Sequence, residues 1–173
     1  SGIPAMMARP VGKKERESDK DGRCSKAEKE EWTTLFDKKV FAMYEVREWA
    51  DVARDARLKH HVVHMGRVFG IMVEKNSELK SDDPLKKMKY RVVFQGNNVT
   101  TANWECAVFQ DEGASPASMD ASKSVDAWGC FPRHDIEQAD AEQAYLQSDY
   151  VGTETWVALP EEAWPDDWWK QGD

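Results

Sequence analysis

The chain has 173 residues, of which 40% are hydrophobic and 32% are charged, and its net charge at pH 7 is −8. This composition is typical of a globular protein, and the length is enough for one domain with a real core. No apolar stretch approaches the ~20 residues that a membrane-spanning helix needs. Residues 1–14 also lack an apolar segment of signal-peptide length. We therefore expect no membrane partner and an intracellular protein, in the cytoplasm or nucleus, that is not secreted.

Charge is distributed unevenly along the chain. Residues 57–95 contain nine basic and four acidic side chains, whereas residues 111–173 contain three basic and fifteen acidic ones. Nucleic-acid affinity is carried largely by Lys and Arg that neutralise phosphates, so a polymerase can use such a division. The basic segment would contact phosphates and the acidic segment would supply metal-binding carboxylates. A solvated protein surface gives the same pattern, and charge alone leaves both interpretations open.

The first expected element is a helix that follows a polar segment. Residues 1–24 are rich in Gly, Pro and charged side chains, which predicts a flexible charged lead-in. Ser25 and Glu28 form a capping-box pattern, and apolar residues then recur at helical spacing. We therefore predict a helix over residues 25–38.

A long hairpin is expected in the middle of the chain. Residues 40–46 first predict a short strand, and residues 48–59 predict either a helix or irregular structure. Residues 62–73 and 90–94 are rich in β-branched and apolar side chains and predict two strands. Asp82-Asp83-Pro84 supplies turn chemistry between them, so we expect the two strands to pair as a hairpin.

The last third of the chain mixes loops with short elements. Residues 97–114 predict a polar loop anchored by Trp104 and Phe109, and Ser118 is placed to cap a helix that ends near Trp128. The three cysteines (Cys24, Cys106 and Cys130) form no CxxC pair and are expected to be free thiols. The remaining expected elements are a strand at 135–141, a short turn or helix at 143–147 and a strand at 155–159.

One local pattern suggests metal chemistry. Asp140 ends the strand expected at 135–141, and Tyr145 follows on a tight turn. Such an aspartate can hold a divalent cation, and the aromatic ring can lie beside a sugar. Metal-assisted phosphoryl transfer needs carboxylates that clamp Mg²⁺ on substrate phosphates, usually at two-metal sites. A strand-end aspartate can equally be a turn or cap residue, so this pattern by itself leaves the function open.

Several motifs in the same order and spacing resemble copia-type retrotransposon reverse transcriptases. The similarity covers most of residues 25–165. The segment Lys-Tyr-Arg-Val-Val-Phe-Gln-Gly at 89–96 resembles the basic fingers strand of that family, and Ser-Pro-Ala at 115–117 resembles the Ser-Pro-Val before its helix. Residues 138–146 resemble the first catalytic motif, and residues 152–160 resemble a segment that ends in a Pro-containing loop.

The resemblance implies a right-hand polymerase fold of the α+β class, with antiparallel hairpins and packed helices. Residues 25–165 would hold the fingers and the first part of the palm, and residues 166–173 would be a truncated tail. Asp140 would be the first catalytic, metal-binding carboxylate, assisted by the carbonyl of Ala141, and the cofactor would be Mg²⁺ or Mn²⁺. Arg91 and Lys89 would bind the incoming deoxynucleotide triphosphate, since Arg gives bidentate phosphate contacts. Tyr145 would exclude the ribose 2′-hydroxyl.

The sequence also departs from the family pattern. The family has a second catalytic motif, an aspartate pair on a hairpin, and Asp166-Asp167 lacks the helix that should precede such a pair. Gln95 stands where the family usually has Lys. We therefore expect a fragment of an RNA-directed DNA polymerase that is inactive alone. The rest of the palm, the thumb and the RNase H portion of the polyprotein would be partners, together with RNA/DNA template-primer.

Two alternatives to a polymerase fragment remain open. The chain could be a decayed or domesticated remnant that acts only as a binding or interaction module. Residues 17–28 also match an EF-hand loop at positions 3, 5, 6, 9 and 12, where oxygen ligands and the turn glycine belong, so a calcium-binding segment is a minor alternative. His60, His61 and His64 have the spacing of metal ligands on a helix, but no Glu lies between them as a zinc protease requires.

Overall fold

The fold is of the α+β class, as expected, with helices and a mixed sheet. The chain divides into two units, one comprising residues 1–107 and 151–173 and the other residues 108–150, and we describe each by itself. Among the described residues, every helix is too short or too polar to traverse a bilayer. The computed structural model describes residues 7–107, 117–137, 139, 143–147, 149–165 and 168.

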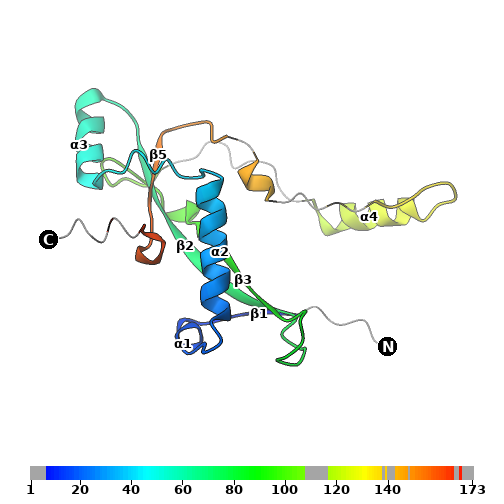
Figure 1. The fold of residues 1–173 in the computed structure, drawn as a ribbon. Helices are drawn as coiled ribbons and strands as arrows, with labels where there is room; N and C mark the ends of the chain where they lie inside the picture. Colours follow the sequence, from blue (N-terminus) through cyan, green and yellow to red (C-terminus); the bar gives the residue numbers. More distant parts are fainter. Residues whose placement is uncertain are drawn as a thin grey trace. The chain divides into compact units, whose positions relative to one another are not determined.

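A long central strand organises the first unit (Figure 1). Strand β2 (His64–Lys75) pairs through its carboxyl-terminal part, from Val68 onward, with β1 (Ala8–Pro10) and β3 (Lys87–Phe94), both antiparallel. Its amino-terminal end pairs with β4 (Thr100–Thr101), also antiparallel, and with β5 (Thr155–Ala158), which runs parallel. All the other strands therefore take their position from β2.

The expected hairpin is confirmed by the pairing of β2 with β3. The register runs from Val68 opposite Phe94 to Lys75 opposite Lys87. In the connection, the Asp83 carboxylate accepts a hydrogen bond from the Leu85 backbone N–H at 2.9 Å. This side-chain-to-backbone bond is the turn chemistry that an aspartate before proline supplies. The expected strand at 155–159 is also found, as β5.

The expected flexible lead-in is wrong for residues 8–24, which are folded. They form β1 and a short helix α1 (Lys13–Glu17). Val11, between the two, is buried, and its backbone N–H donates to the Met72 carbonyl at 2.9 Å. A polar segment can fold in this way because β1 is short and gains its backbone hydrogen bonds from the edge of a strand that is already formed.

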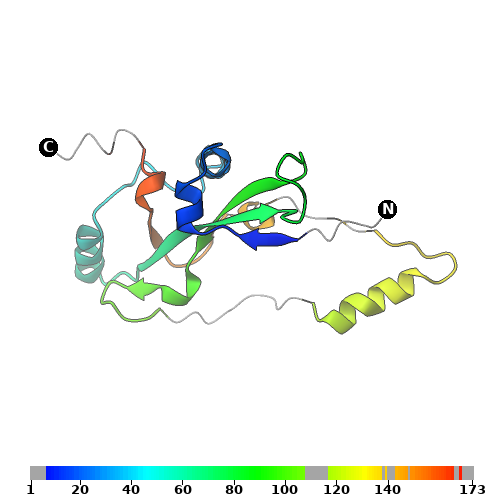
Figure 2. The ribbon, with the colours of Figure 1, turned by 90° about the horizontal axis from the view of Figure 1, so that it is seen from below.

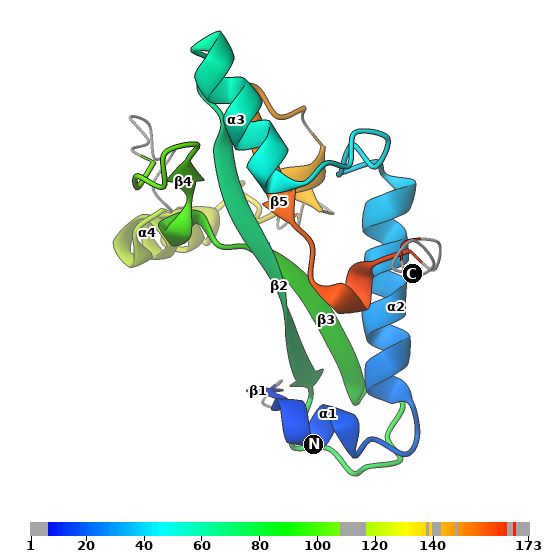
Figure 3. The same ribbon diagram turned by 90° about the vertical axis from the view of Figure 1, so that its left-hand side faces the viewer.

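Helix α2 (Arg23–Asp37) confirms the first expected helix, but its start differs. The capping box does not form, because the helix begins ahead of Ser25. Gly22 adopts a left-handed conformation with φ 67°, and the Asp19 carboxylate accepts from the Cys24 backbone N–H at 2.6 Å. Figure 3 shows α2 running along β3, and its buried side chains include Trp32 and Leu35.

Another helix packs near the amino-terminal end of β2. Helix α3 (Trp49–Lys59) resolves the open prediction for residues 48–59 in favour of helix. One face of it enters a core that also contains Val63 and Ala102, with Trp156 packed against it. The predicted strand at 40–46 is wrong, because these residues form turns and bends. The ring of Phe41 instead packs near Trp32 and Phe36 of α2, at centroid distances of 6.4 and 6.3 Å.

The loop after β3 is anchored by other residues than expected. It contains a 3₁₀ turn, η1 (Gly96–Asn98), followed by β4. Trp104, an expected anchor, is 69% exposed, and Phe109 lies outside the described residues. The small side chains of Ala102 and Ala107 are buried, as is Val99. After β5 the chain makes one more 3₁₀ turn, η3 (Glu161–Ala163), in which Ala163 is buried.

The unit at 108–150 contains the helix that Ser118 was expected to cap. Helix α4 (Met119–Gly129) begins as predicted, with the Ser118 hydroxyl accepting from the Ala121 backbone N–H at 3.1 Å. The short turn or helix expected at 143–147 is found as a 3₁₀ turn, η2 (Ala144–Leu146). Residues 135–137 and 139 are not in a strand, contrary to prediction, and the Asp135 carboxylate accepts from the Ile136 N–H at 2.9 Å. Such a local bond competes with strand pairing.

Candidate nucleic-acid interface

The β2–β3 hairpin has one covered face and one exposed face. Successive side chains of a strand point to opposite sides, and along β2 the exposure alternates accordingly. Met72 and Glu74 are buried on the side of α2, whereas Phe69 and Ile71 are 44% and 40% exposed on the other side. Figure 2 shows α2 on one side of the strands. We call the exposed side of β2 and β3 the open face.

Basic side chains gather on the open face. Lys75 lies opposite Lys87 in the register, and Ile71 lies opposite Arg91, so these four side chains share one side of the hairpin. Strands β1 to β3, which the structure describes in full, contain a single acidic residue, Glu74, and it is on the covered face. The open face consists of Arg67, Phe69, Ile71, Val73 and Lys75 from β2 and Lys87, Lys89, Arg91 and Val93 from β3, with the two valines partly buried.

The open face has the chemistry of a surface for single-stranded nucleic acid. Side chains two residues apart on a strand are about 7 Å apart, so Lys87, Lys89 and Arg91 form a row of cations. An exposed aromatic ring, Phe69, lies on the neighbouring strand. Proteins that bind single strands combine a positively charged track for the phosphates with aromatic side chains on which bases stack. Both parts are present on one side of one hairpin.

Close packing on the covered face holds the hairpin in position. Tyr90 is 1% exposed, and a Cβ added at Gly70 would lie 1.7 Å from its Oη atom. Gly70 is therefore the residue that makes room for the tyrosine ring. The Arg16 guanidinium lies over that ring at 5.3 Å and donates to the Glu28 carboxylate at 2.8 Å. Burial, together with the nearby Glu28 charge, raises the pKa of Tyr90 to about 12.

A buried carboxylate fastens the far end of the hairpin. Glu74 accepts a hydrogen bond from the Arg9 Nε atom at 2.8 Å, and the Lys86 ammonium lies 3.8 Å from its other oxygen. Lys86 also donates to the carbonyls of Ser77 and Leu79, both at 3.1 Å. These bonds tie β1 and the β2–β3 connection to the covered face. The cations of the open face are thus carried by a rigid support.

The structure brings together some of the residues expected at the site. Lys89 and Arg91 lie two residues apart on β3, on the same face, with Arg91 exposed and Lys89 partly buried. Tyr145 belongs to η2 in the unit at 108–150. Asp140 and Ala141, the expected metal-binding residues, lie outside the described residues, as do Asp166 and Asp167.

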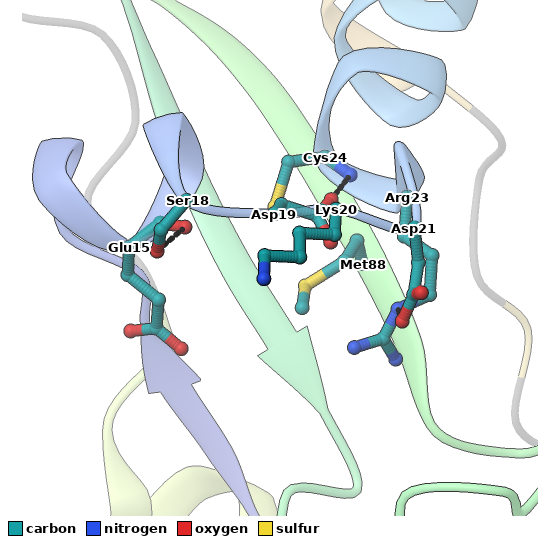
Figure 4. Close-up of a pocket in the computed structure, with 8 residues that line it drawn as sticks. All are labelled: Glu15, Ser18, Asp19, Lys20, Asp21, Arg23, Cys24 and Met88. Atoms are coloured by element: carbon teal, nitrogen blue, oxygen red, sulfur yellow. Dashed lines mark hydrogen bonds and ion pairs between the residues drawn. The ribbon is translucent and has the colours of Figure 1, made fainter.

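The EF-hand-like segment folds as a helix cap. Figure 4 shows a shallow polar pocket where α1, the start of α2 and Met88 meet. The Asp19 carboxylate accepts from the Cys24 N–H, and this bond lowers the pKa of Asp19. Glu28, the last ligand position of the pattern, is paired with Arg16. Through the described part of the chain, no three His, Cys, Asp or Glu side chains gather where they could hold a metal ion.

The three histidines have separate environments. His60 ends α3 in a left-handed conformation, His61 has its Nδ1 atom 3.6 Å from a Glu154 carboxylate oxygen, and His64 is buried at the start of β2. A zinc site on a helix needs His side chains on one helical face, and His64 is on a strand. Cys24, Cys106 and Cys130 are free thiols, as expected.

Sequence reasoning missed the part of the open face that β2 contributes. The apolar composition of residues 62–73 predicts a strand but does not separate its two sides. The sequence holds little signal for it, because Phe69 and Ile71 are as apolar as Val68 and Met72 on the covered face. Comparison with protein-family models, curated proteins and solved structures finds no match for this chain.

Proposed function

We propose that this chain forms the fingers and the first part of the palm of a copia-type RNA-directed DNA polymerase, and that it contacts the nucleic-acid strand through the open face. The observation that carries the proposal is the row of Lys87, Lys89 and Arg91 beside exposed Phe69, on the side of strands β2 and β3 that holds no acidic residue. The strand concerned is the one whose sequence resembles the basic fingers strand of that family.

The proposed division of labour follows the resemblance residue by residue. Arg91 and Lys89 bind the triphosphate of the incoming nucleotide when one is present and strand phosphates when none is, and Tyr145 excludes the ribose form of that nucleotide. Asp140 and the carbonyl of Ala141 provide oxygen ligands, which Mg²⁺ prefers in proteins. A bound Mg²⁺ or Mn²⁺ would neutralise charge on the phosphates during nucleotidyl transfer. The second aspartate pair would come from another segment of the polymerase.

A second candidate is a binding module without polymerase activity. The open face favours it independently, since phosphate contacts on β3 and a stacking surface on β2 require no catalytic carboxylates. In that case the chain would bind single strands and take no part in nucleotide addition. The two candidates share the interface and differ in chemistry, so two experiments are needed.

The first experiment tests the interface. The double variant Lys87→Gln/Arg91→Gln is compared with Lys26→Gln/Lys29→Gln, which removes the same charge from exposed positions on α2. Binding of fluorescein-labelled 12-nucleotide RNA and DNA is followed by fluorescence anisotropy at several salt concentrations. We expect the open-face variant to lose about tenfold in affinity and the slope of log K against log salt to fall by about 1.4, the value for two lost contacts to a single strand. Equal losses in the two variants would contradict the assignment.

The second experiment tests the chemistry. Primer extension with Mg²⁺ is measured on this chain and on a longer polypeptide that also carries the family's aspartate-pair motif. We expect extension with the longer polypeptide alone, and its loss in Asp140→Asn with template binding kept. Tyr145→Ala in the longer polypeptide should relax discrimination against ribonucleotides. Extension by neither polypeptide would favour the binding module. Extension by this chain without the added motif would overturn the proposal that the aspartate pair comes from another segment.

A further inference from the structure

Trp104 combines two unfavourable features. Its side chain is 69% exposed to solvent, and its backbone is left-handed, with φ 65°. Left-handed backbone is rare for bulky residues because Cβ approaches the following carbonyl. Residues in such conformations persist where the surrounding structure determines them, and they gather at functional sites. The left-handed backbone closes the turn of the hairpin at 101–105. Glycine or asparagine would close it at lower cost, so the exposed indole is the feature that folding leaves unexplained, and a binding role is the reason to consider for it.

The hairpin that carries Trp104 is fixed on both sides. The Thr101 N–H donates to the Glu105 carbonyl at 2.8 Å, and the Trp104 N–H donates to the Thr101 carbonyl at 3.0 Å. Next to it, the Arg57 guanidinium of α3 donates to the Ala102 carbonyl at 2.6 Å, and the Ala102 side chain is in the core. The indole is thus presented to solvent on a backbone that other contacts hold in place.

The Trp104 hairpin begins beside the end of the open face. Thr100 of β4 lies opposite Met65 of β2, and β2 continues from there through Arg67 to Phe69. Strand β3 ends at the same place, since the N–H of Gln95, the residue after β3, donates to the Arg67 carbonyl at 2.8 Å. A strand of nucleic acid that follows the open face toward the start of β2 therefore arrives at this hairpin.

The charges around the indole favour contact with a base over contact with a phosphate. Arg57 and Lys59, at the end of α3, are exposed and would attract the backbone of a nucleic acid. Glu105, the residue next to Trp104, is also exposed and would repel a phosphate placed on the ring. Aromatic side chains stack on every base, since every base has a flat π-face.

We infer that Trp104 is a stacking platform for one nucleobase of the single strand whose phosphates lie on the open face. This inference rests on the proposed interface and adds a residue that the family resemblance does not assign. Stacking of this kind is tolerant of sequence, so the site would hold the strand in register without selecting a base.

The test separates base contacts from phosphate contacts. Affinity is measured by anisotropy for a labelled 12-nucleotide oligo-dT and for an abasic 12-mer with the same phosphates. We expect Trp104→Ala to weaken oligo-dT binding at least about fivefold, the lower end for one lost stack, and to change binding of the abasic strand less than about twofold. Trp104→Phe should retain most of the affinity. Equal losses on both strands would overturn the inference.

A second variant excludes loss of folding as the cause. Trp104→Asn places at this position a residue that tolerates left-handed backbone, so its melting temperature should be no lower than that of the wild type while its oligo-dT affinity falls as in Trp104→Ala. If Trp104→Asn and Trp104→Ala bind oligo-dT like the wild type while Lys87→Gln/Arg91→Gln binds weakly, the inference fails and the proposed function stands. If the wild type binds neither strand, the proposed function itself fails.

Discussion

The two faces of the β2–β3 hairpin are built from alternate residues of the same two strands, and their properties are opposite. On the covered face, Tyr90 and Met72 are buried, and Glu74 is satisfied by ion pairs. On the open face, the neighbouring residues Arg91 and Ile71 are exposed. A shift of one residue along the chain changes a structural position into a surface position, because side chains of a strand alternate in direction.

The two faces restrict the amino-acid sequence in different ways. The covered face is determined by volume, since Gly70 and Tyr90 fit only as a pair. The open face is determined by charge, and its basic residues make no comparable demand on packing. Substitutions on the covered face should therefore change stability and leave binding chemistry alone, and those on the open face should do the reverse.

The largest expected effect comes from a matched pair of truncations on β2. Met72→Ala removes a side chain that is 3% exposed and leaves a cavity, so the free energy of unfolding should fall by about 3 kcal/mol. Ile71→Ala removes a neighbour that is 40% exposed and should cost less than about 1 kcal/mol. Urea denaturation of both variants measures the difference. Similar losses would show that the open face is covered in solution.

Gly70→Ala tests the volume constraint on the covered face. The new Cβ would overlap the Tyr90 side chain, and overpacking of this kind costs about 2 kcal/mol. Gly96→Ala is the control, since a Cβ there meets nothing within 4 Å. Thermal denaturation of the two variants gives the comparison, and a Gly70→Ala protein as stable as Gly96→Ala would refute the close approach.

Glu74→Gln should have a smaller effect. It removes the buried partner of Arg9 and Lys86, but Arg9 is partly exposed, and water replaces part of its lost interaction. We expect a loss of about 1 to 2 kcal/mol in unfolding free energy, measured by urea titration. Glu30→Gln, an exposed position on α2, should change stability little. If Glu74→Gln leaves the unfolding free energy unchanged, the ion pairs of Glu74 do not hold β1 in place.

The pH dependence of stability gives a finer test of the same face. Burial raises the pKa of Tyr90 to about 12 in the folded protein, so between the ordinary value of 10 and 12 the folded state holds a proton that the unfolded state releases. The contribution is fully present below pH 10 and is lost as the pH rises through 12. Urea titrations at pH 9 to 12 should show this loss, and Tyr90→Phe should reduce it. Cys24 contributes in the same direction, because burial raises its pKa to about 11.

The hairpin and the capped helices could be predicted because their signals are local. Ser118 caps α4 with its own side chain, and Asp83 makes the turn between β2 and β3. Residues 8–24 could not be predicted, since β1 depends on pairing with Arg9 opposite Glu74, a partner far along the chain. The capping box at Ser25 failed for a related reason, because Gly22 lets α2 begin earlier.

The two sides of β2 could not be distinguished from sequence until the position of α2 was known. Phe69 and Ile71 are as apolar as Val68 and Met72, and burial separates them only because α2 packs on one side. Lys89 and Arg91 were identified through the family resemblance. Trp104 was expected to anchor its loop, and its exposure follows from the smaller Ala102 and Val99 taking the buried positions.

The most direct test of the open face is a nuclear magnetic resonance titration of the ¹⁵N-labelled chain with unlabelled 12-nucleotide oligo-dT. We predict that backbone amide shifts change along β2 from Arg67 to Lys75 and along β3 from Lys87 to Arg91, together with the Trp104 indole N–H. The amides of Lys26 and Lys29 on α2 should stay unchanged. Two results would contradict the proposal that this hairpin binds a nucleic-acid strand. One is shift changes centred on α2, and the other is no shift changes at an excess of oligo-dT.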